Sequence, residues 1–360
     1  MNKKILILSF LSVLFLAAGP IRAAIGVTNL RTEQLKNPSG IDTHQPRLGW
    51  RIESNEQNVM QTAYHILVAS SPELLAQGKG DMWDSGKVET DASQWITYQG
   101  ENLKRNAPYF WKVKVYTNKG ESDWSSPAFW SMGLFNEADW QGQWIGLDRA
   151  APGDSETQWS RLAARYLRKE FALKKEIKRA TVHIAGMGLY ELFINGQRIG
   201  DQVLAPAPTD YRKTILYNTY DVTSQLQQEN AIGVTLGNGR FYTMRQNYKP
   251  YKIPTFGYPK LRLNLIVEYA DGSKETIATN TSWKLTTEGP VRSNNEYDGE
   301  EYDARKELGN WTQTGYDDTK WMPAERVSIP SGTLRAQMMP EMKVTETLKP
   351  VSIQKMGDKY

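Results

Sequence analysis

Apolar and polar residues alternate along most of the chain from about residue 25, and this period of two predicts β-strands. The alternating apolar positions of the first unit are Leu48, Trp50 and Ile52, then Tyr64, Ile66 and Val68, then Trp111, Val113 and Val115. Turn-forming residues separate these runs at 78–81, 99–100 and 118–120. About seven short strands in about a hundred residues are typical of an immunoglobulin-like or fibronectin type III sandwich. We expect Trp50 in its core and Tyr109 in a tyrosine corner.

The same alternation returns in the second half of the chain. The predicted strands there are Ile177–Ile184, Ala231–Leu236, Leu261–Tyr269, Trp283–Thr286 and Val291–Ser293, followed by the acidic segment Asn295–Tyr302. Tight turns at Asn195-Gly196 and Asp271–Ser273 are typical of β-hairpins. The pattern predicts a second β-sandwich and few helices, apart from a short one at Pro72–Gln77. The predicted fold class is therefore all-β.

The pattern also sets the expected domain boundaries. Residues 24–135 form the fibronectin type III-like sandwich, and residues 136–329 form the second sandwich. Residues 330–360 contain Pro340, Pro350 and only a weak strand signal at Lys343–Leu348. They have no core of their own, so we interpret them as the truncated start of a further β-domain.

Residues 1–23 have the layout of a secretory signal peptide. Lys3 and Lys4 precede the apolar run Ile5–Ala18, and Ile21–Ala23 supplies a cleavage site. The run of about fourteen residues is shorter than the roughly twenty that span a bilayer. The chain has no cysteine. We expect an exported, periplasmic bacterial protein with no membrane span after signal cleavage.

Charge and composition narrow the class of partner. The formal net charge is only +4, from 44 Lys and Arg against 40 Asp and Glu, and no long basic run occurs. This balance argues against a nucleic-acid partner. Twelve Trp and eighteen Tyr are many for 360 residues. Most should fill the cores, although exposed rings would also serve as stacking platforms for sugars.

Several motifs, in order and with fitting spacing, resemble the N-terminal accessory region of bacterial α-L-rhamnosidases over residues 25–350. They are Trp144-Ile145-Gly146, Tyr190–Gly196, Thr209-Asp210-Tyr211, Tyr220–Thr223, Gly237-Asn238-Gly239 and Asp298–Ala304. The resemblance implies a fibronectin-like module, then a jelly-roll domain of the galactose-binding type, then the start of a further β-domain.

The resemblance also implies partners. In that family an (α/α)₆ barrel further along the chain hydrolyses the glycosidic bond with inversion. No long amphipathic helices of such a barrel occur in these 360 residues. We therefore expect a truncated or split member, inactive alone, and assign no catalytic residue. Its expected partners are a rhamnose-containing glycan and a catalytic barrel domain of the same or a split polypeptide.

Loop residues of the second sandwich are the candidate binding groups. In related rhamnose-binding jelly rolls, Asn and Asp side chains on loops hold Ca²⁺ and sugar hydroxyls together. We therefore assign Asn195, Asp210, Asn238 and Tyr242 to the glycan, and Asp201 with Asn238 to Ca²⁺.

Each of these residues also has a structural interpretation. A type I′ turn explains Asn195-Gly196 better than a site does. Asn238 between two glycines leaves both readings open, because glycines allow close approach of either a ligand or a neighbouring segment. Tyr242 belongs to an aromatic loop that would stack on a sugar or pack over the end of the sandwich. The aromatic residues of this loop are Phe241, Tyr242, Tyr248, Tyr251, Phe256 and Tyr258.

The acidic segment offers a possible carboxylate pair. On a strand, Glu301 and Asp303 would share one face about 6.6 Å apart, which falls inside the spacing of an inverting glycosidase. Such spacing is common in acidic strands, so a solvated or Arg-paired edge is the favoured interpretation of Glu296, Asp298, Glu300, Glu301 and Asp303. His65 and His183 lie within predicted strands, and we expect them to be structural.

Three functions remain. The favoured one is the non-catalytic N-terminal part of an exported α-L-rhamnosidase, which binds or positions rhamnose-containing glycans and braces the barrel. The alternative is a stand-alone carbohydrate-binding protein of two β-sandwiches. An enzyme active by itself is the least favoured.

Overall fold

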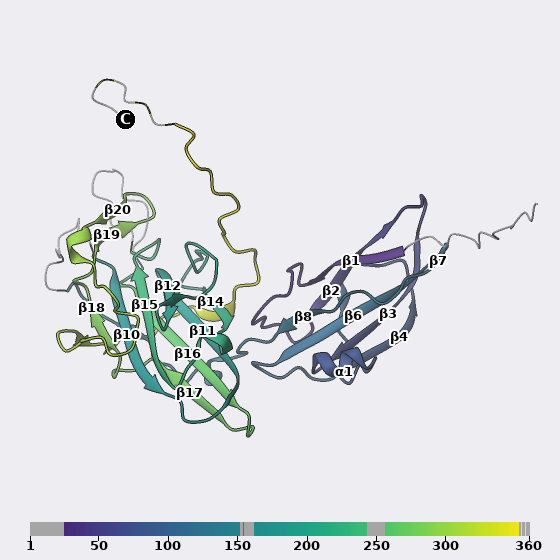
Figure 1. The fold of residues 1–360 in the computed structure, drawn as a ribbon, viewed down its shortest axis with the longest axis horizontal. Coiled ribbons are helices and arrows are strands. Elements are labelled where there is room, and N and C mark those ends of the chain that lie inside the picture. Colours follow the sequence, from purple (N-terminus) through teal and green to yellow (C-terminus); the bar gives the residue numbers. More distant parts are fainter. Residues whose placement is uncertain are drawn as a thin grey trace, which may run out of the picture.

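The computed structural model describes residues 25–151, 154, 162–242, 256–352, 354 and 357. Two β-sandwiches lie side by side, and after β23 (Thr333–Ala336) the chain leaves the second one without further helices or strands in its described part (Figure 1). The nearly all-β architecture confirms the predicted fold class. The predicted signal peptide at residues 1–23 lies outside the described residues. Within the described part, no helix is long and apolar enough to cross a membrane.

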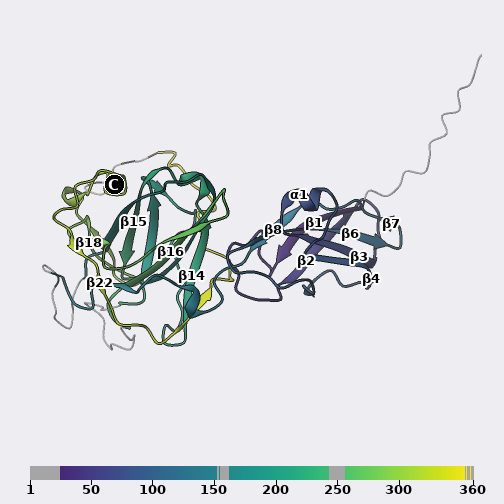
Figure 2. The same cartoon turned by 90° about the horizontal axis from the view of Figure 1, so that it is seen from below.

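The first domain is an immunoglobulin-like sandwich of two sheets, whose long strands are seen together in Figure 2. One sheet holds β1 (Ile25–Thr32), β2 (Arg47–Ser54) and β5 (Ile96–Thr97). The other holds β4 (Trp83–Glu89), β3 (Gln61–Ala69), β6 (Pro108–Thr117) and β7 (Gly120–Glu121), with β8 (Ala128–Ser131) beside β6. The helix α1 (Pro72–Ala76) falls where the sequence predicted it.

The core of this domain contains the residues that alternation selected. Trp50 and Trp111 are fully buried, and the Trp50 indole nitrogen donates to Gln61 Oε1 at 3.0 Å. The Tyr109 hydroxyl accepts a hydrogen bond from the Lys104 main chain at 2.7 Å. That bond is the one a tyrosine corner makes, so the expected roles of Trp50 and Tyr109 are confirmed.

The second domain is a jelly roll of two larger sheets. The first contains β13 (Gln197–Arg198), β12 (Leu189–Ile194), β15 (Glu229–Gly237), β10 (Arg165–Ala172), β18 (Lys284–Thr286) and β21 (Met322–Pro323) in that order. The second contains β22 (Glu325–Arg326), β9 (Ile145–Gly146), β16 (Lys260–Tyr269), β11 (Ile177–Met187), β14 (Thr214–Asp221) and β23 (Thr333–Ala336), with β17 (Lys274–Ala278) beside β16.

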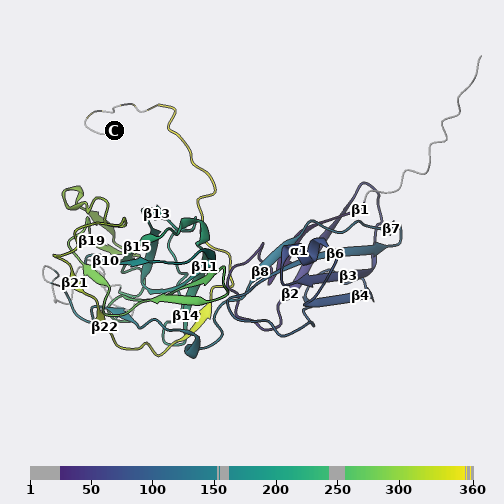
Figure 3. The ribbon, with the colours of Figure 1, turned by 60° about the horizontal axis from the view of Figure 1, so that its bottom comes forward.

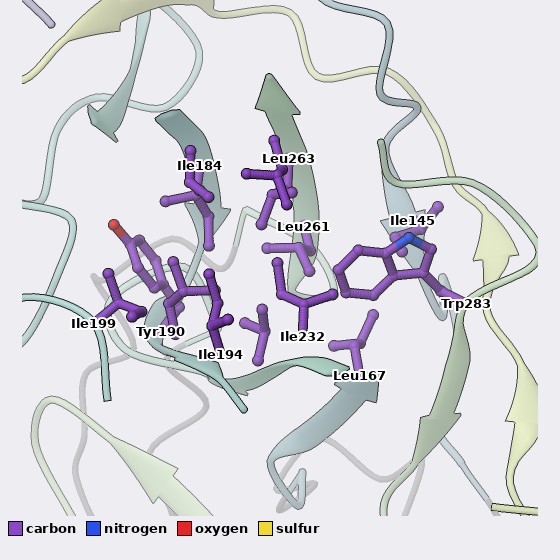
Figure 4. Close-up of a cluster of buried hydrophobic side chains, with 14 of the residues drawn as sticks. Ile145, Leu167, Ile184, Tyr190, Ile194, Ile199, Ile232, Leu261, Leu263 and Trp283 are labelled. Carbon is purple, nitrogen blue, oxygen red and sulfur yellow. The ribbon is translucent and has the colours of Figure 1, made fainter. Parts of the chain in front are cut away.

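The core of the jelly roll lies between these sheets (Figure 4). Leu261 and Leu263 of β16 face Ile232 of β15 and Leu167 of β10, and Trp283 closes one end of the cluster. All five side chains are fully buried. Because burial removes about 25 cal/mol of unfavourable hydration per Å² of apolar surface, this cluster is the main source of the domain's stability.

Short elements decorate the jelly roll. A two-stranded hairpin of β19 (Val291–Asn295) and β20 (Gly299–Tyr302) stands at one end of the domain, near the ends of β10 and β18 (Figure 1). The 3-10 helices are η1 (Glu137–Asp139), η2 (Thr223–Gln225) and η3 (Ala304–Lys306). The hairpin forms one wall of the candidate site described below.

The C-terminal segment differs from its predicted place in a further domain. Strand β23 pairs in parallel with β14, from Thr214 opposite Thr333 to Tyr217 opposite Ala336, and lies along the edge of the jelly roll in Figure 3. Beyond it, the Val203 amide donates to Met342 O at 2.9 Å. The jelly roll therefore continues past residue 329, because an open sheet edge accepts this strand even though its sequence is weakly apolar.

Polar contacts join the two sandwiches. The Tyr217 hydroxyl donates to Leu134 O at 2.8 Å and accepts from Leu134 N at 2.9 Å. Asp42 of the first domain accepts from the Ala336 amide of β23 at 3.1 Å. The strand β23 and the loop of residues 40–42 thus connect both domains.

Candidate functional site

A groove with a volume of about 580 Å³ opens at one end of the jelly roll. Four segments surround it: the start of β12, the end of β15 with the loop to Arg240, the loop around residues 203–211, and the β19–β20 hairpin. Its apolar lining residues are Ala164, Leu189, Val203, Leu204, Pro208, Tyr211, Val291 and Met342. A concave apolar surface with a few polar groups is the usual form of a small-molecule site.

Two glycines shape the β15 side of this groove. A Cβ on Gly237 would lie 2.7 Å from Asn294 Oδ1, and a Cβ on Gly239 would lie 2.7 Å from Leu189 Cγ. Gly239 also has φ +51°, a backbone conformation that favours glycine. The two glycines therefore allow the end of β15 to pack closely against the hairpin and against β12, and these three segments form one wall of the groove.

Asn238, between these glycines, is buried behind the wall and hydrogen-bonds to the segments beside it. It is 2% exposed, and its Nδ2 donates to Leu162 O and Asn294 O, each at 2.8 Å. Its main-chain amide donates to Asn294 Oδ1 at 2.6 Å. Asn238 is not among the residues that line the groove. The sequence left two interpretations of Asn238 open, a ligand contact and close packing of neighbouring segments. The structure supports close packing.

The groove rim carries charge and amide groups. Arg240 Nη1 lies 3.4 Å from Glu296 Oε1, and both side chains are about two-fifths exposed, at 42% and 40%. Asn294, Asn295 and Glu300 complete this edge. These groups supply both hydrogen-bond donors and acceptors, so the rim is suited to hydroxyl groups rather than to an ion of one sign.

Tyr211 belongs to the groove floor. It is 4% exposed and packs edge-on against Phe241 at 5.2 Å. Burial raises the pKa of Tyr211 to about 12, so its hydroxyl is neutral at physiological pH. The floor is therefore apolar and uncharged.

Two predicted glycan residues lie close to the groove in sequence without lining it. Asp210 precedes Tyr211, and its carboxylate pairs with Arg212, whose Nε lies 2.9 Å away; this hydrogen bond holds the pKa of Asp210 below its usual range. Tyr242 is 8% exposed and stacks on Tyr258 with ring centres 5.8 Å apart. Tyr242 thus packs against another aromatic residue of the same predicted loop, whose Tyr248 and Tyr251 lie outside the described residues.

Asn195 occupies the hairpin turn between β12 and β13. Its φ is 50° and that of Gly196 is 81°, as a type I′ turn requires. Its Nδ2 donates to Gln225 O and Asn230 Oδ1, and its Oδ1 accepts from Ala231 N, all at 2.9 Å. The Asn195 amide is thus engaged inside the fold and lies apart from the groove lining.

Asp201 and Asn238, the predicted Ca²⁺ ligands, do not lie together. The Asp201 side chain is 72% exposed and pairs with Lys343 Nζ at 2.8 Å, while Asn238 is buried beneath the groove. Nor do the described residues contain a group of three or more His, Cys, Asp or Glu side chains arranged to hold a metal. Because Ca²⁺ takes six to eight oxygen ligands, these two residues do not fit a shared Ca²⁺ site.

The acidic pair Glu301 and Asp303 does not share a strand face. Strand β20 ends at Tyr302. Asp303 instead caps η3, and its carboxylate accepts from Arg305 Nε at 2.8 Å. The Arg305 guanidinium holds the pKa of Asp303 at about 2. The geometric argument for a carboxylate pair therefore fails at this position, and Asp303 is Arg-paired.

A second cavity, of about 530 Å³, lies between the two domains. We call it the interdomain cavity. The segment Leu35–Ser39 forms its wall in the first domain, and Asp201, Asn218 and Tyr220 line it from the jelly roll. Asn218 is buried, and its Oδ1 accepts from the Tyr190 hydroxyl at 2.8 Å.

Several residues that line the groove were not predicted from the sequence. Leu204 is 57% exposed with φ 54°, and it precedes Ala205-Pro206. The sequence offered one signal for Leu204 as a lining residue, namely an apolar side chain directly before a proline-containing loop. Met342 reaches the groove only because the C-terminal segment returns along the loop at Val203, and no local pattern indicates that return.

Two family models match the chain. Residues 27–136 match the Rha78A-like N-terminal immunoglobulin domain, and residues 175–346 match the α-L-rhamnosidase N-terminal domain. The second match contains every residue that lines the groove except Ala164.

Known proteins with the same two domains are longer than this chain. An α-L-rhamnosidase of Formosa agariphila is 38% identical over 342 residues, which are 89% of this chain and 36% of that protein. The solved α-L-rhamnosidase of Dictyoglumus thermophilum superposes with a TM-score of 0.80 at 39% identity, over 91% of this chain and 37% of that one. A Streptomyces avermitilis α-L-rhamnosidase, solved in complex with L-rhamnose, gives 0.80 at 25% identity, over 90% and 47%. The chain thus spans about a third of the first curated relatives.

Proposed function

Because residues 27–136 and 175–346 of this chain belong to the α-L-rhamnosidase family as its N-terminal domains, we propose that the chain binds rhamnose-containing glycans and positions them for a catalytic barrel. The observation that carries this proposal is the groove at the end of the jelly roll. It combines an apolar floor with an amide, guanidinium and carboxylate rim.

The chemistry of L-rhamnose matches this division. A 6-deoxyhexopyranoside has an apolar methyl group at C6 and hydroxyl groups on the ring carbons C2, C3 and C4. The methyl group would contact Leu204 and Met342, and the hydroxyl groups would bond to Arg240 and the neighbouring amides. The related Streptomyces protein was solved with L-rhamnose, which supports the same ligand class for this family.

The second part of the proposal is that the two domains brace the barrel. Two side chains join the sandwiches by hydrogen bonds to the main chain of the other domain: Tyr217 of the jelly roll bonds to Leu134, and Asp42 of the first domain bonds to Ala336. A unit held by such contacts would present a fixed surface to a third domain. Hydrolysis of α-L-rhamnosides belongs to the proposed whole protein, since the relatives that bear that name are about three times as long as the matched region.

We also propose export through residues 1–23, on the basis of their basic, apolar and small-residue order. Expression in a bacterium with and without this segment tests the proposal. The expected N-terminus of the exported protein, by mass spectrometry, is Ala24. An uncleaved cytoplasmic product would contradict it.

Isothermal titration of methyl α-L-rhamnoside tests the binding function. We expect saturable binding to the wild-type chain and about tenfold weaker binding to Arg240→Gln, because a charge-assisted hydrogen bond is lost. The matched control is Arg305→Gln, which removes an ion-paired arginine outside the groove lining and should leave affinity unchanged. Equal affinity in both variants would place the ligand elsewhere.

The bracing role needs a separate measurement. A helical barrel from a relative is expressed alone and fused after the two domains, and its thermal unfolding is followed by circular dichroism. We expect the barrel transition to rise in temperature when the domains precede it. An unchanged transition would remove bracing from the account.

A further inference from the structure

An exposed tryptophan on the first domain is not accounted for by the groove. Trp95 is 54% exposed, and it directly precedes β5. Its φ of 61° is in the left-handed region, where a bulky residue is a genuine outlier. Sparsely populated backbone conformations persist where the surrounding structure enforces them, and they cluster at functional sites.

The surrounding structure does enforce this conformation. On one side, the Gln94 side-chain Nε2 donates to Trp50 O at 2.7 Å, and the Trp50 main-chain amide donates to Ser93 O at 3.0 Å. On the other side, Ile96 pairs with Leu48 of β2. The backbone at Trp95 is therefore fixed from both directions, and the indole is held outside the core.

An arginine lies over one face of the ring. The Arg47 guanidinium carbon is 4.4 Å from the Trp95 ring centroid, a cation–π geometry. Arg47 is in turn gripped by Glu33, whose side chain is only 5% exposed and accepts from Arg47 Nη2 at 2.5 Å and from Arg47 Nε at 3.0 Å. We call Trp95, Arg47 and Glu33 the Trp95 platform.

The surroundings of the platform distinguish between classes of ligand. A protein interface has an apolar core surrounded by a polar rim. The one other large hydrophobic residue that is exposed in the described first domain is Met60, and polar Gln34 and Gln94 lie beside the platform, with side chains 3.5 Å apart. A single exposed aromatic ring, with a guanidinium group over one face and amide groups nearby, fits the apolar face and hydroxyl groups of a pyranose instead.

The platform also adjoins the interdomain cavity along the chain. Gln34 is followed directly by Leu35, the first of the five consecutive residues that line that cavity.

We propose that the Trp95 platform is a second carbohydrate-binding site, which takes a hexopyranose unit of a polysaccharide by stacking on the exposed part of the indole. It lies on the immunoglobulin-like domain, so it shares only the ligand class with the proposed groove. Its role would be to hold the chain on its polymeric substrate.

Native affinity electrophoresis of the full chain tests this proposal. The gels contain one of three soluble polymers: a polysaccharide with terminal α-L-rhamnosyl units, dextran, or mannan. The diagnostic variant is Trp95→Gly. Glycine adopts a φ of 61° without strain, so this variant should fold with an unchanged or raised unfolding temperature. Met60→Ala, which removes the other exposed hydrophobic side chain, is the control.

We expect at least one polymer to retard the wild-type chain and Met60→Ala equally, and to bind Trp95→Gly about tenfold more weakly. For polymers that the groove does not bind, Arg240→Gln should be retarded as strongly as the wild type. Loss of binding at the groove and loss of binding at the platform are therefore seen in different variants. Retardation that is absent from the wild type, or unchanged in folded Trp95→Gly, would overturn the proposal.

Discussion

His183 of the jelly roll and Asn106 of the immunoglobulin-like domain are hydrogen-bonded across the domain boundary, with His183 Nε2 3.0 Å from Asn106 Oδ1. The other ring nitrogen, Nδ1, lies 2.9 Å from Thr219 Oγ1. The side chain is fully buried. Because both nitrogens are engaged within the fold, this histidine orients one domain against the other, as its place in a predicted strand suggested.

This contact predicts a pH dependence of stability. Burial, reinforced by the nearby Arg179 charge, lowers the pKa of His183 from 6.5 to about 3. The unfolded chain therefore takes up a proton that the folded chain excludes as the pH falls below about 6.5. Stability from this residue is complete above pH 6.5 and decreases toward pH 3, by up to about 1.4 kcal/mol per pH unit. Urea unfolding between pH 7.5 and 5 measures it.

The variant His183→Gln should flatten this pH dependence while lowering stability at pH 7.5. His44→Gln is the matched control, since His44 is exposed, and it should keep the wild-type slope. A wild-type slope in His183→Gln would contradict the assignment.

Asn238 should behave as a structural residue. Asn238→Ala removes the donors to Leu162 O and Asn294 O, which leaves two acceptors without their partner. We expect a loss of about 1–3 kcal/mol in the free energy of unfolding, measured in urea. The exposed residue Asn310 is the control, and Asn310→Ala should change stability by less than about 0.5 kcal/mol. An Asn238→Ala variant of wild-type stability that no longer binds rhamnoside would make Asn238 a ligand contact.

Ca²⁺ should have no effect on glycan affinity. Asp201 is paired with Lys343 and lies apart from buried Asn238, so the predicted ligand pair is not formed. Titration of methyl α-L-rhamnoside in excess EDTA and in millimolar CaCl₂ should give the same affinity. Binding that requires CaCl₂ would show that other oxygen ligands assemble a site.

The isolated 360-residue chain should not hydrolyse an aryl α-L-rhamnoside. Asp303 is ion-paired with Arg305 and lies beyond the end of β20, so the shared strand face that would space it from Glu301 for inversion is not formed. The measurement is release of the coloured aglycone by purified protein. Turnover that remains through purification and disappears in Glu301→Gln would contradict this prediction.

The strands and their buried faces could be predicted because period-two alternation reports burial directly. Trp50 and Tyr109 had the positions expected of an immunoglobulin-like core. Asn195 was also predictable, since an Asn-Gly pair between two strands favours one turn type.

The groove could not be predicted in the same way. Arg240 meets Glu296 across 56 residues of sequence, and Met342 reaches Val203 from the other end of the domain. Such pairs depend on sheet order, which local patterns do not encode. The role of Asn238 depended on whether a ligand or Asn294 occupied the space beside Gly237, and only the three-dimensional arrangement decides between them.

Saturation-transfer difference NMR with methyl α-L-rhamnoside is the most direct test of the groove as a rhamnose site. If the C6 methyl group enters the apolar floor beside Leu204 and Met342, its protons should receive the strongest saturation, and Leu204→Gly should abolish that preference. The same variant relieves the φ of 54° at residue 204, so it should remain folded. An absent signal, or a methyl signal unchanged in folded Leu204→Gly, would contradict the account.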